Sequence, residues 1–108
     1  MSSTPSAGFH VVYRWRLREG SEASFRAAWS AVTQAIRREH GGLGSRLHRA
    51  EDGWWVAYAA WPDRARWESM QAATQSVLPD AAAVMGAAIV ESAPPLLLEP
   101  LEDLLDAD

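Results

Sequence analysis

The chain has 108 residues and a formal net charge of −4 at pH 7, and a single domain with a modest core is expected at this length. It contains no cysteine, which excludes disulfides, thiolate nucleophiles and thiolate metal sites. All ten basic residues are arginine, which excludes a Schiff-base lysine and a phosphate-binding loop of the Gly-Lys-Ser/Thr type.

The two ends of the chain differ in composition from the part between them. Residues 1–8 are small or polar, lack the features of a signal peptide, and are expected to form a disordered lead-in. Residues 102–108 are an acidic tail, which leaves residues 9–101 as the predicted domain. No apolar run is long enough to span a membrane and no basic patch indicates nucleic acid, so we expect a cytoplasmic protein that binds neither.

The first half of the chain predicts a strand, a helix and a second strand. Residues 9–17 place apolar or aromatic side chains at every odd-numbered position, which is typical of a strand. Apolar residues recur at helical spacing over residues 22–40, with Ser21 as the expected N-terminal cap and Gly41-Gly42 at the end. Residues 43–50 predict the second strand, which a tight turn at residues 51–53 joins to a third.

The third predicted strand is unusually apolar. Residues 54–61 are all apolar or aromatic and lie between Gly53 and Pro62. A strand with one face in water alternates apolar with polar residues, and this one does not. We therefore expect helices of the same chain to cover one face and a second copy of the chain to cover the other.

The remaining elements complete an α+β fold. A helix is predicted from Asp63 to about residue 73, a further helix from residue 80 to about residue 91, and a short strand at residues 96–98 after Pro94-Pro95. The order β-α-β-β-α-β is ferredoxin-like, with a four-stranded antiparallel sheet and helices on one face.

Several short segments, in this order, carry a family resemblance. They are residues 18–25 (REGSEASF), 42–49 (GLGSRLHR), 52–53 (DG) and 57–62 (AYAAWP), followed by Trp67. Together they resemble the antibiotic biosynthesis monooxygenase (ABM) domain family of the dimeric α/β-barrel superfamily. The resemblance implies a homodimer whose two sheets form a barrel, with a pocket between sheet and helices in each subunit. Some members oxidise polycyclic phenols with dioxygen and no cofactor, and others oxidise quinols or degrade haem.

Haem cleavage is not expected here. Haem-degrading relatives carry an iron-binding histidine after the third strand, an asparagine in the first strand and a tryptophan at the end of the third. Trp61 matches the tryptophan, but Tyr13 stands at the asparagine position and no histidine follows His48. The three histidines also lack ligand-like spacing, so we expect no metal and no cofactor.

A flat pocket is predicted on one face of the sheet. Odd-numbered residues of the first and third strands share a face in this fold, and the small residues Ala57 and Ala59 leave room between large rings. The predicted lining is Tyr13, Trp15, Trp55, Ala57, Ala59 and Trp61, with Trp29, Trp67 and Met85 above it. The alternative is an aromatic core without a cavity.

The position of a catalytic base depends on the hairpin register. A two-residue loop turns His48 toward the pocket, whereas a three-residue loop pairs Leu47 with Ala57 and turns His48 to the other face. The strand arginines are either an anion site or partners in ion pairs; they are Arg14, Arg16, Arg46 and Arg49.

These residues predict a cofactor-independent monooxygenase acting on a planar phenolic, anthrone-like or quinol-like molecule. Tyr13 would orient the substrate, Trp61 would form the wall and His48 would be the base. Its partners would be a second copy of the chain, a small aromatic molecule and dioxygen. The alternative is a non-catalytic small-molecule-binding or assembly domain of the same fold.

Overall fold

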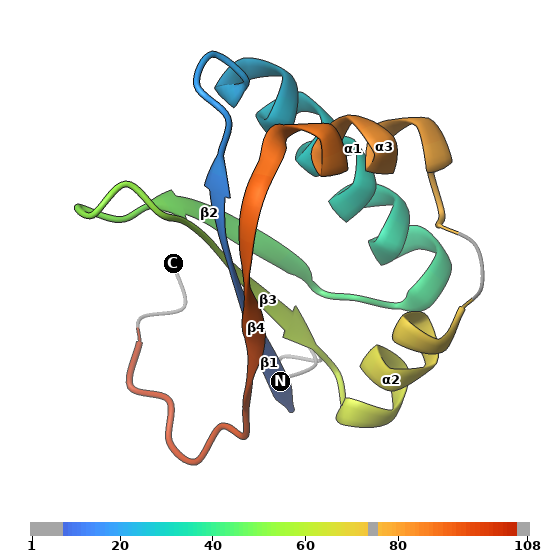
Figure 1. Cartoon of the computed structure of the whole chain (residues 1–108). Helices are drawn as coiled ribbons and strands as arrows, with labels where there is room; N and C mark the ends of the chain where they lie inside the picture. The colour runs from blue at the N-terminus through green and yellow to red at the C-terminus, as the bar shows by residue number, and fades with distance from the viewer. Residues whose placement is uncertain (1–7, 74–75, 106–108) are drawn as a thin grey trace.

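The computed structural model describes residues 8–73 and 76–105. The elements are β1 (Phe9–Leu17), α1 (Glu22–His40), β2 (Gly44–Arg49), β3 (Trp55–Trp61), α2 (Arg64–Ala72), α3 (Pro79–Ala88) and β4 (Ile89–Leu98). The strands form one antiparallel sheet in the order β2-β3-β1-β4. All three helices lie on one side of the sheet, and the segment after β4 runs along the other side (Figure 1). The predicted α+β, ferredoxin-like fold is confirmed.

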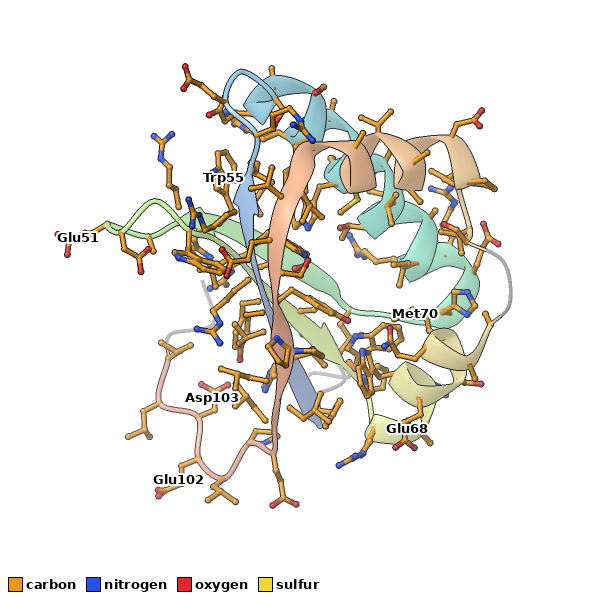
Figure 2. All side chains as sticks on the ribbon, viewed as in Figure 1. Glu51, Trp55, Glu68, Met70, Glu102 and Asp103 are labelled. Carbon is orange, nitrogen blue, oxygen red and sulfur yellow. The ribbon has the colours of Figure 1, made fainter. Side chains whose placement is uncertain are left out.

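Two expectations about the ends of the chain stay predictions. The expected lead-in at residues 1–8 lies outside the described residues except for Gly8, whose N–H donates to the Trp61 carbonyl at 3.0 Å. The acidic tail is described only to Leu105, and Glu102 and Asp103 project from the segment after β4 (Figure 2). Among the described residues, no helix has both the length and the apolar character needed to cross a membrane.

The faces of the sheet follow from the strand pattern. Odd-numbered residues of β1 and β3 pair with one another and pack under the helices, as Val11 does with Ala59. Phe25 of α1 is fully buried between Trp15 and Trp55, with ring centroids 5.3 Å and 6.0 Å away. The even-numbered residues of β3 are half-buried on the face away from the helices. We call that side of the sheet the open face.

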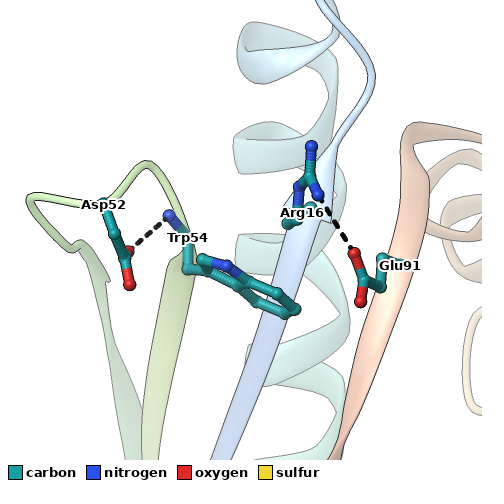
Figure 3. Close-up of polar contacts among 4 residues, drawn as sticks. All are labelled: Arg16, Asp52, Trp54 and Glu91. Carbon is teal, nitrogen blue, oxygen red and sulfur yellow. Dashed lines mark hydrogen bonds and ion pairs between the residues drawn. The ribbon is translucent and has the colours of Figure 1, made fainter.

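The β2–β3 hairpin has the three-residue loop. The Ala50 N–H donates to the Trp54 carbonyl at 2.8 Å, and Gly53 adopts the left-handed conformation with φ of 90°. The Asp52 carboxylate accepts a hydrogen bond from the Trp54 N–H at 3.0 Å, which holds the turn (Figure 3). Leu47 therefore pairs with Ala57, as the second of the two predicted registers requires.

Two details of the predicted helices need correction. Ser21 precedes α1 but its side chain does not cap the helix: its hydroxyl donates back to the Arg18 carbonyl at 2.6 Å instead. The third helix ends at Ala88 rather than near residue 91, because Ile89 already has extended backbone angles and begins β4.

The final strand is also longer than predicted. β4 continues through Pro94-Pro95 instead of beginning after them. Proline is tolerated there because β4 is an edge strand, and its pairing with β1 shifts register between Val12 and Arg14, opposite this segment.

Replacing Gly53 with alanine tests the hairpin geometry, with Gly86→Ala in α3 as the matched control. A Cβ atom at either position meets no atom within 4 Å, so only the backbone conformation differs. Gly53→Ala should lower the free energy of unfolding by about 1 kcal/mol because its φ is positive, whereas Gly86→Ala should raise it by about 0.5–1 kcal/mol. Urea unfolding of both variants measures the difference, and a stabilising Gly53→Ala would contradict the left-handed turn.

Candidate functional site

A cavity of about 220 Å³ lies between the sheet and the helices. Its floor comes from β1, β2 and β3, and its walls come from α1, the loop before β2, α2 and α3. Met70 of α2 lies among the side chains between that helix and the sheet (Figure 2). The residues that line it are Tyr13, Trp15, Trp29, Val32, Thr33, Ile36, Arg37, Gly42, Gly44, Ser45, Ala59, Ala60, Trp61, Met70, Gln71 and Met85.

Most of the predicted pocket residues line this cavity. They are Tyr13, Trp15, Trp29, Ala59, Trp61 and Met85. Trp55 and Ala57 are buried but do not line it, because Trp55 packs edge-on against Phe25 and fills that part of the interlayer space. Trp67 is likewise buried outside the lining, with its ring 5.7 Å from that of Phe9. The open space therefore lies toward the Ala59 end of the predicted pocket.

Tyr13 is held in place by a residue from α2. The Trp67 indole Nε1–H donates to the Tyr13 hydroxyl oxygen at 2.9 Å. Burial raises the pKa of Tyr13 above its ordinary value, and the hydrogen bond from Trp67 opposes that rise by stabilising the phenolate. The phenol therefore keeps its proton at neutral pH. Because its oxygen already accepts from Trp67, its O–H is available to donate to a ligand in the cavity.

His48 does not face the cavity. It pairs with Val56 on β3, so its side chain belongs to the face opposite Leu47, and it is exposed. The sequence allowed a register in which His48 reached the pocket, and that alternative is wrong because the loop contains three residues rather than two. Within one subunit, the predicted role of His48 as a base in the cavity has no geometrical support.

Four polar residues of the lining were not predicted from the sequence: Thr33, Arg37, Ser45 and Gln71. The Ser45 hydroxyl is buried without a hydrogen-bond partner among the described residues. Ser45 sits at an odd-numbered position of β2, beside Ala59 of β3, and that shared face was the signal that could have identified it. None of the described residues in the lining is a histidine or a carboxylate, and the described residues contain no cluster suited to a metal ion.

The strand arginines lie outside the cavity. Arg16 forms an ion pair with Glu91 of the neighbouring strand at 3.2 Å, and both side chains are exposed (Figure 3). The Arg49 guanidinium lies 5.7 Å from the centre of the Trp55 ring. For Arg16, the ion-pair alternative is therefore confirmed.

Comparison with known proteins supports this fold. A family model described as antibiotic biosynthesis monooxygenase matches residues 8–78. SnoaB from Streptomyces nogalater, a cofactor-independent oxygenase, is 19% identical with a TM-score of 0.73, covering 94% of this chain and all of that one (100%). Rv0793 from Mycobacterium tuberculosis is 20% identical (TM-score 0.68, covering 90% of this chain and 98% of that one). PA3566 from Pseudomonas aeruginosa is 17% identical (TM-score 0.66, covering 93% of this chain and 100% of that one). No protein of curated function matches the sequence significantly.

Replacing Trp67 with phenylalanine removes the hydrogen bond to Tyr13 while keeping an aromatic ring. The pKa of Tyr13 should rise further, because the remaining influence is burial, and the free energy of unfolding should fall by about 1–2 kcal/mol. A spectrophotometric titration in a Tyr58→Phe background, where Tyr13 is the only tyrosine, measures the pKa.

Trp29→Phe is the matched control for this titration. Trp29 also lines the cavity, but the hydrogen bond to Tyr13 comes from Trp67. An equal change of the Tyr13 pKa in both variants would contradict a specific role for the Trp67 N–H.

Proposed function

Because the chain belongs to the antibiotic biosynthesis monooxygenase family, we propose that it is a cofactor-independent monooxygenase acting on a planar phenolic, anthrone-like or quinol-like molecule. The observation that carries the proposal is the aromatic cavity with the Tyr13 phenol in its wall. Apolar pockets with a few placed polar groups are the usual form of small-molecule sites. We also propose that the protein is cytoplasmic, as expected from the sequence.

The proposed reaction needs only the substrate and dioxygen. The substrate loses a proton from a phenol or activated carbon, and the resulting anion gives one electron to dioxygen. The substrate radical and superoxide combine to a peroxide anion at a carbon that still carries a hydrogen, and the anion takes up a proton to give a hydroperoxide. The hydroperoxide then loses water to leave a carbonyl group. One oxygen atom enters the product and the other enters water, so the oxidation of the substrate carbon balances the reduction of dioxygen without an external reductant.

The residues of the cavity have separate roles in this proposal. Tyr13 donates a hydrogen bond to an oxygen of the substrate and so orients it, since Trp67 occupies the acceptor side of its hydroxyl. Trp61 is 2% exposed and forms a rigid wall, against which a planar ring can stack. The apolar lining keeps water from the reacting anion.

A second candidate function is a non-catalytic binding domain of the same fold. The observation that favours it is the lining itself, in which no described histidine or carboxylate stands ready to take the substrate proton. Catalysis without such a base requires a substrate acidic enough to enter as the anion or to be ionised by a nearby positive charge.

A homodimer formed through the open face is the assembly we propose. Val12 lies at its centre, between Tyr58 of β3 and Leu96 of β4, and Leu96 is 47% exposed. Arg14 is on the same face, and its Nε atom is buried without a hydrogen-bond partner among the described residues. An acceptor from a second copy would satisfy this atom, and apolar contact would cover the valine and leucine.

Oxygen uptake by metal-free protein tests the proposed activity. With a panel of anthrones, naphthols and hydroquinones, we expect saturable uptake by the wild type and a loss of about tenfold in Tyr13→Phe, because one orienting hydrogen bond is removed. Tyr58→Phe, which changes the tyrosine of the open face, is the matched control.

Two outcomes would decide against this account of the site. Absence of uptake across the panel, with ligand binding retained, would favour the binding domain. His48→Ala should keep its uptake because its side chain faces away from the cavity; a loss there would restore the histidine as the base.

Sedimentation velocity of Val12→Arg tests the proposed dimer. A charged side chain at the centre of the open face should convert a dimer to a monomer, because the arginine could not be buried without a partner. Val84→Arg on α3, where the valine is 42% exposed on the helix side, should leave the dimer intact. A wild-type monomer, or a dimeric Val12→Arg, would contradict the proposed interface.

A further inference from the structure

We propose that Arg37 and Ser45 form an anion-binding end of the cavity, and that its ligand is a planar aromatic anion. The ligand's oxyanion lies at Arg37 and Ser45, and a second oxygen accepts the hydrogen bond from Tyr13. This inference rests on the proposed function for the identity of the site, and it adds the charge of the substrate and the residues that recognise it.

The first observation is the position of the Arg37 side chain. Arg37 is in the last turn of α1 and lines the cavity together with Gly44 and Ser45. Its Cδ and Nε atoms lie 3.8 Å and 3.9 Å from the place that a Cβ atom of Gly44 would occupy. The arginine stem therefore packs against the first residue of β2, and Arg37 and Ser45 line the same end of the cavity.

The second observation is that Arg37 has no ion-pair partner in the described part of the chain. The ion pairs found there are Arg16 with Glu91 and Arg64 with Glu68. The Arg37 side chain is exposed on its outer side, so solvent stabilises the free charge and screens part of its attraction for a ligand. An anion at the rim of the cavity meets a guanidinium that forms no ion pair with any described carboxylate.

The third observation is the unsatisfied hydroxyl of Ser45. Its Oγ atom is buried and has no hydrogen-bond partner among the described residues. A buried hydroxyl without a partner is unfavourable, and most such groups in proteins are paired with protein, water or ligand. A ligand oxyanion beside Arg37 would accept this hydrogen bond, so two independent groups favour negative charge at the same end of the cavity.

The sheet sets the distance between this end and Tyr13. Ser45 of β2 is in one row with Ala59 and Val11, and Tyr13 of β1 is in the next row with Ala57 and Leu47. Two strand spacings and two residues along the strand place the Cα atoms of Ser45 and Tyr13 about 12 Å apart. Side chains that reach inward from both ends leave a gap suited to a fused-ring molecule with oxygen atoms at both ends.

Arg37 would also allow the substrate to ionise in a cavity that has no base. A guanidinium near a phenol or enol lowers the pKa of that group, because it favours the ionised form. The ligand would then be bound as the anion that reacts with dioxygen, with no proton acceptor required from the lining.

A binding experiment separates this inference from the proposed oxygenase activity. The probes are an anthraquinone carboxylate and the carboxamide of the same isomer, which share ring system and carbonyl oxygens and differ in charge. Quenching of tryptophan fluorescence measures each Kd. The wild type should bind the carboxylate about tenfold more tightly, as expected for one partly screened, charge-assisted contact.

Arg37→Gln is the test variant and Arg38→Gln is its matched control. Arg38 is in the same helical turn but does not line the cavity. Arg37→Gln should abolish the preference for the carboxylate, Arg38→Gln should retain it, and Ser45→Ala should reduce it severalfold. Equal affinity of the wild type for both probes, no saturable binding of either, or a preference that survives in Arg37→Gln would overturn the inference. Oxygen uptake decides the proposed activity separately, since preferential carboxylate binding without uptake leaves the anion site standing.

Discussion

The pairing of β1 with β3 and of β3 with β2 determines which side chains face the helices. Side chains alternate between the two faces of a strand, so a shift of one residue would exchange every group between the cavity and the open face. In the observed register, Trp61, Ala59 and Ser45 share the helix side. The left-handed Gly53 makes this register possible, because a three-residue loop needs one residue with positive φ. The composition of the cavity depends on that turn.

The cavity exists because small residues lie where two layers approach. On the helix-facing side of β3, Ala57 and Ala59 lie between the larger residues Trp55 and Trp61. The methyl group of Ala59 leaves space that an aromatic side chain would fill. Gly42, in the loop before β2, is a second small residue at a close approach between segments. A Cβ atom there would meet the Ile36 Cγ2 atom at 3.2 Å and the Trp61 ring at 3.5 Å. The glycine thus lets the loop approach Ile36 and Trp61 closely at the wall of the cavity.

The two faces of the sheet have different chemical character. The cavity on the helix side combines a rigid aromatic wall with a neutral phenol and one arginine at its rim. The open face carries His10 stacked on Tyr58, with ring centroids 4.8 Å apart, beside arginine side chains and exposed leucines. An apolar cavity with one cationic end suits a planar anion, whereas the open face suits contact with another protein surface. Each function we propose follows from the face on which its residues lie.

By itself the sequence determined the order and type of the elements, because the period of its apolar residues differs between strands and helices. The alternation in residues 9–17 and the helical spacing in residues 22–40 depend only on local pattern, and the structure confirms both elements. Local pattern was insufficient for β4, since Pro94-Pro95 is compatible with a strand only at the edge of a sheet.

Tertiary structure decided which of the expected side chains line the cavity and which other residues join them. Trp67 meets Tyr13 across 54 positions of sequence, and Trp55, expected to line the pocket, packs instead against Phe25. The side to which His48 turns depended on whether the loop had two or three residues, and the sequence allowed both. Arg37 and Ser45 line the same cavity only because the last turn of α1 packs beside the start of β2. Such contacts depend on the packing of distant segments, which no periodicity within a segment can specify.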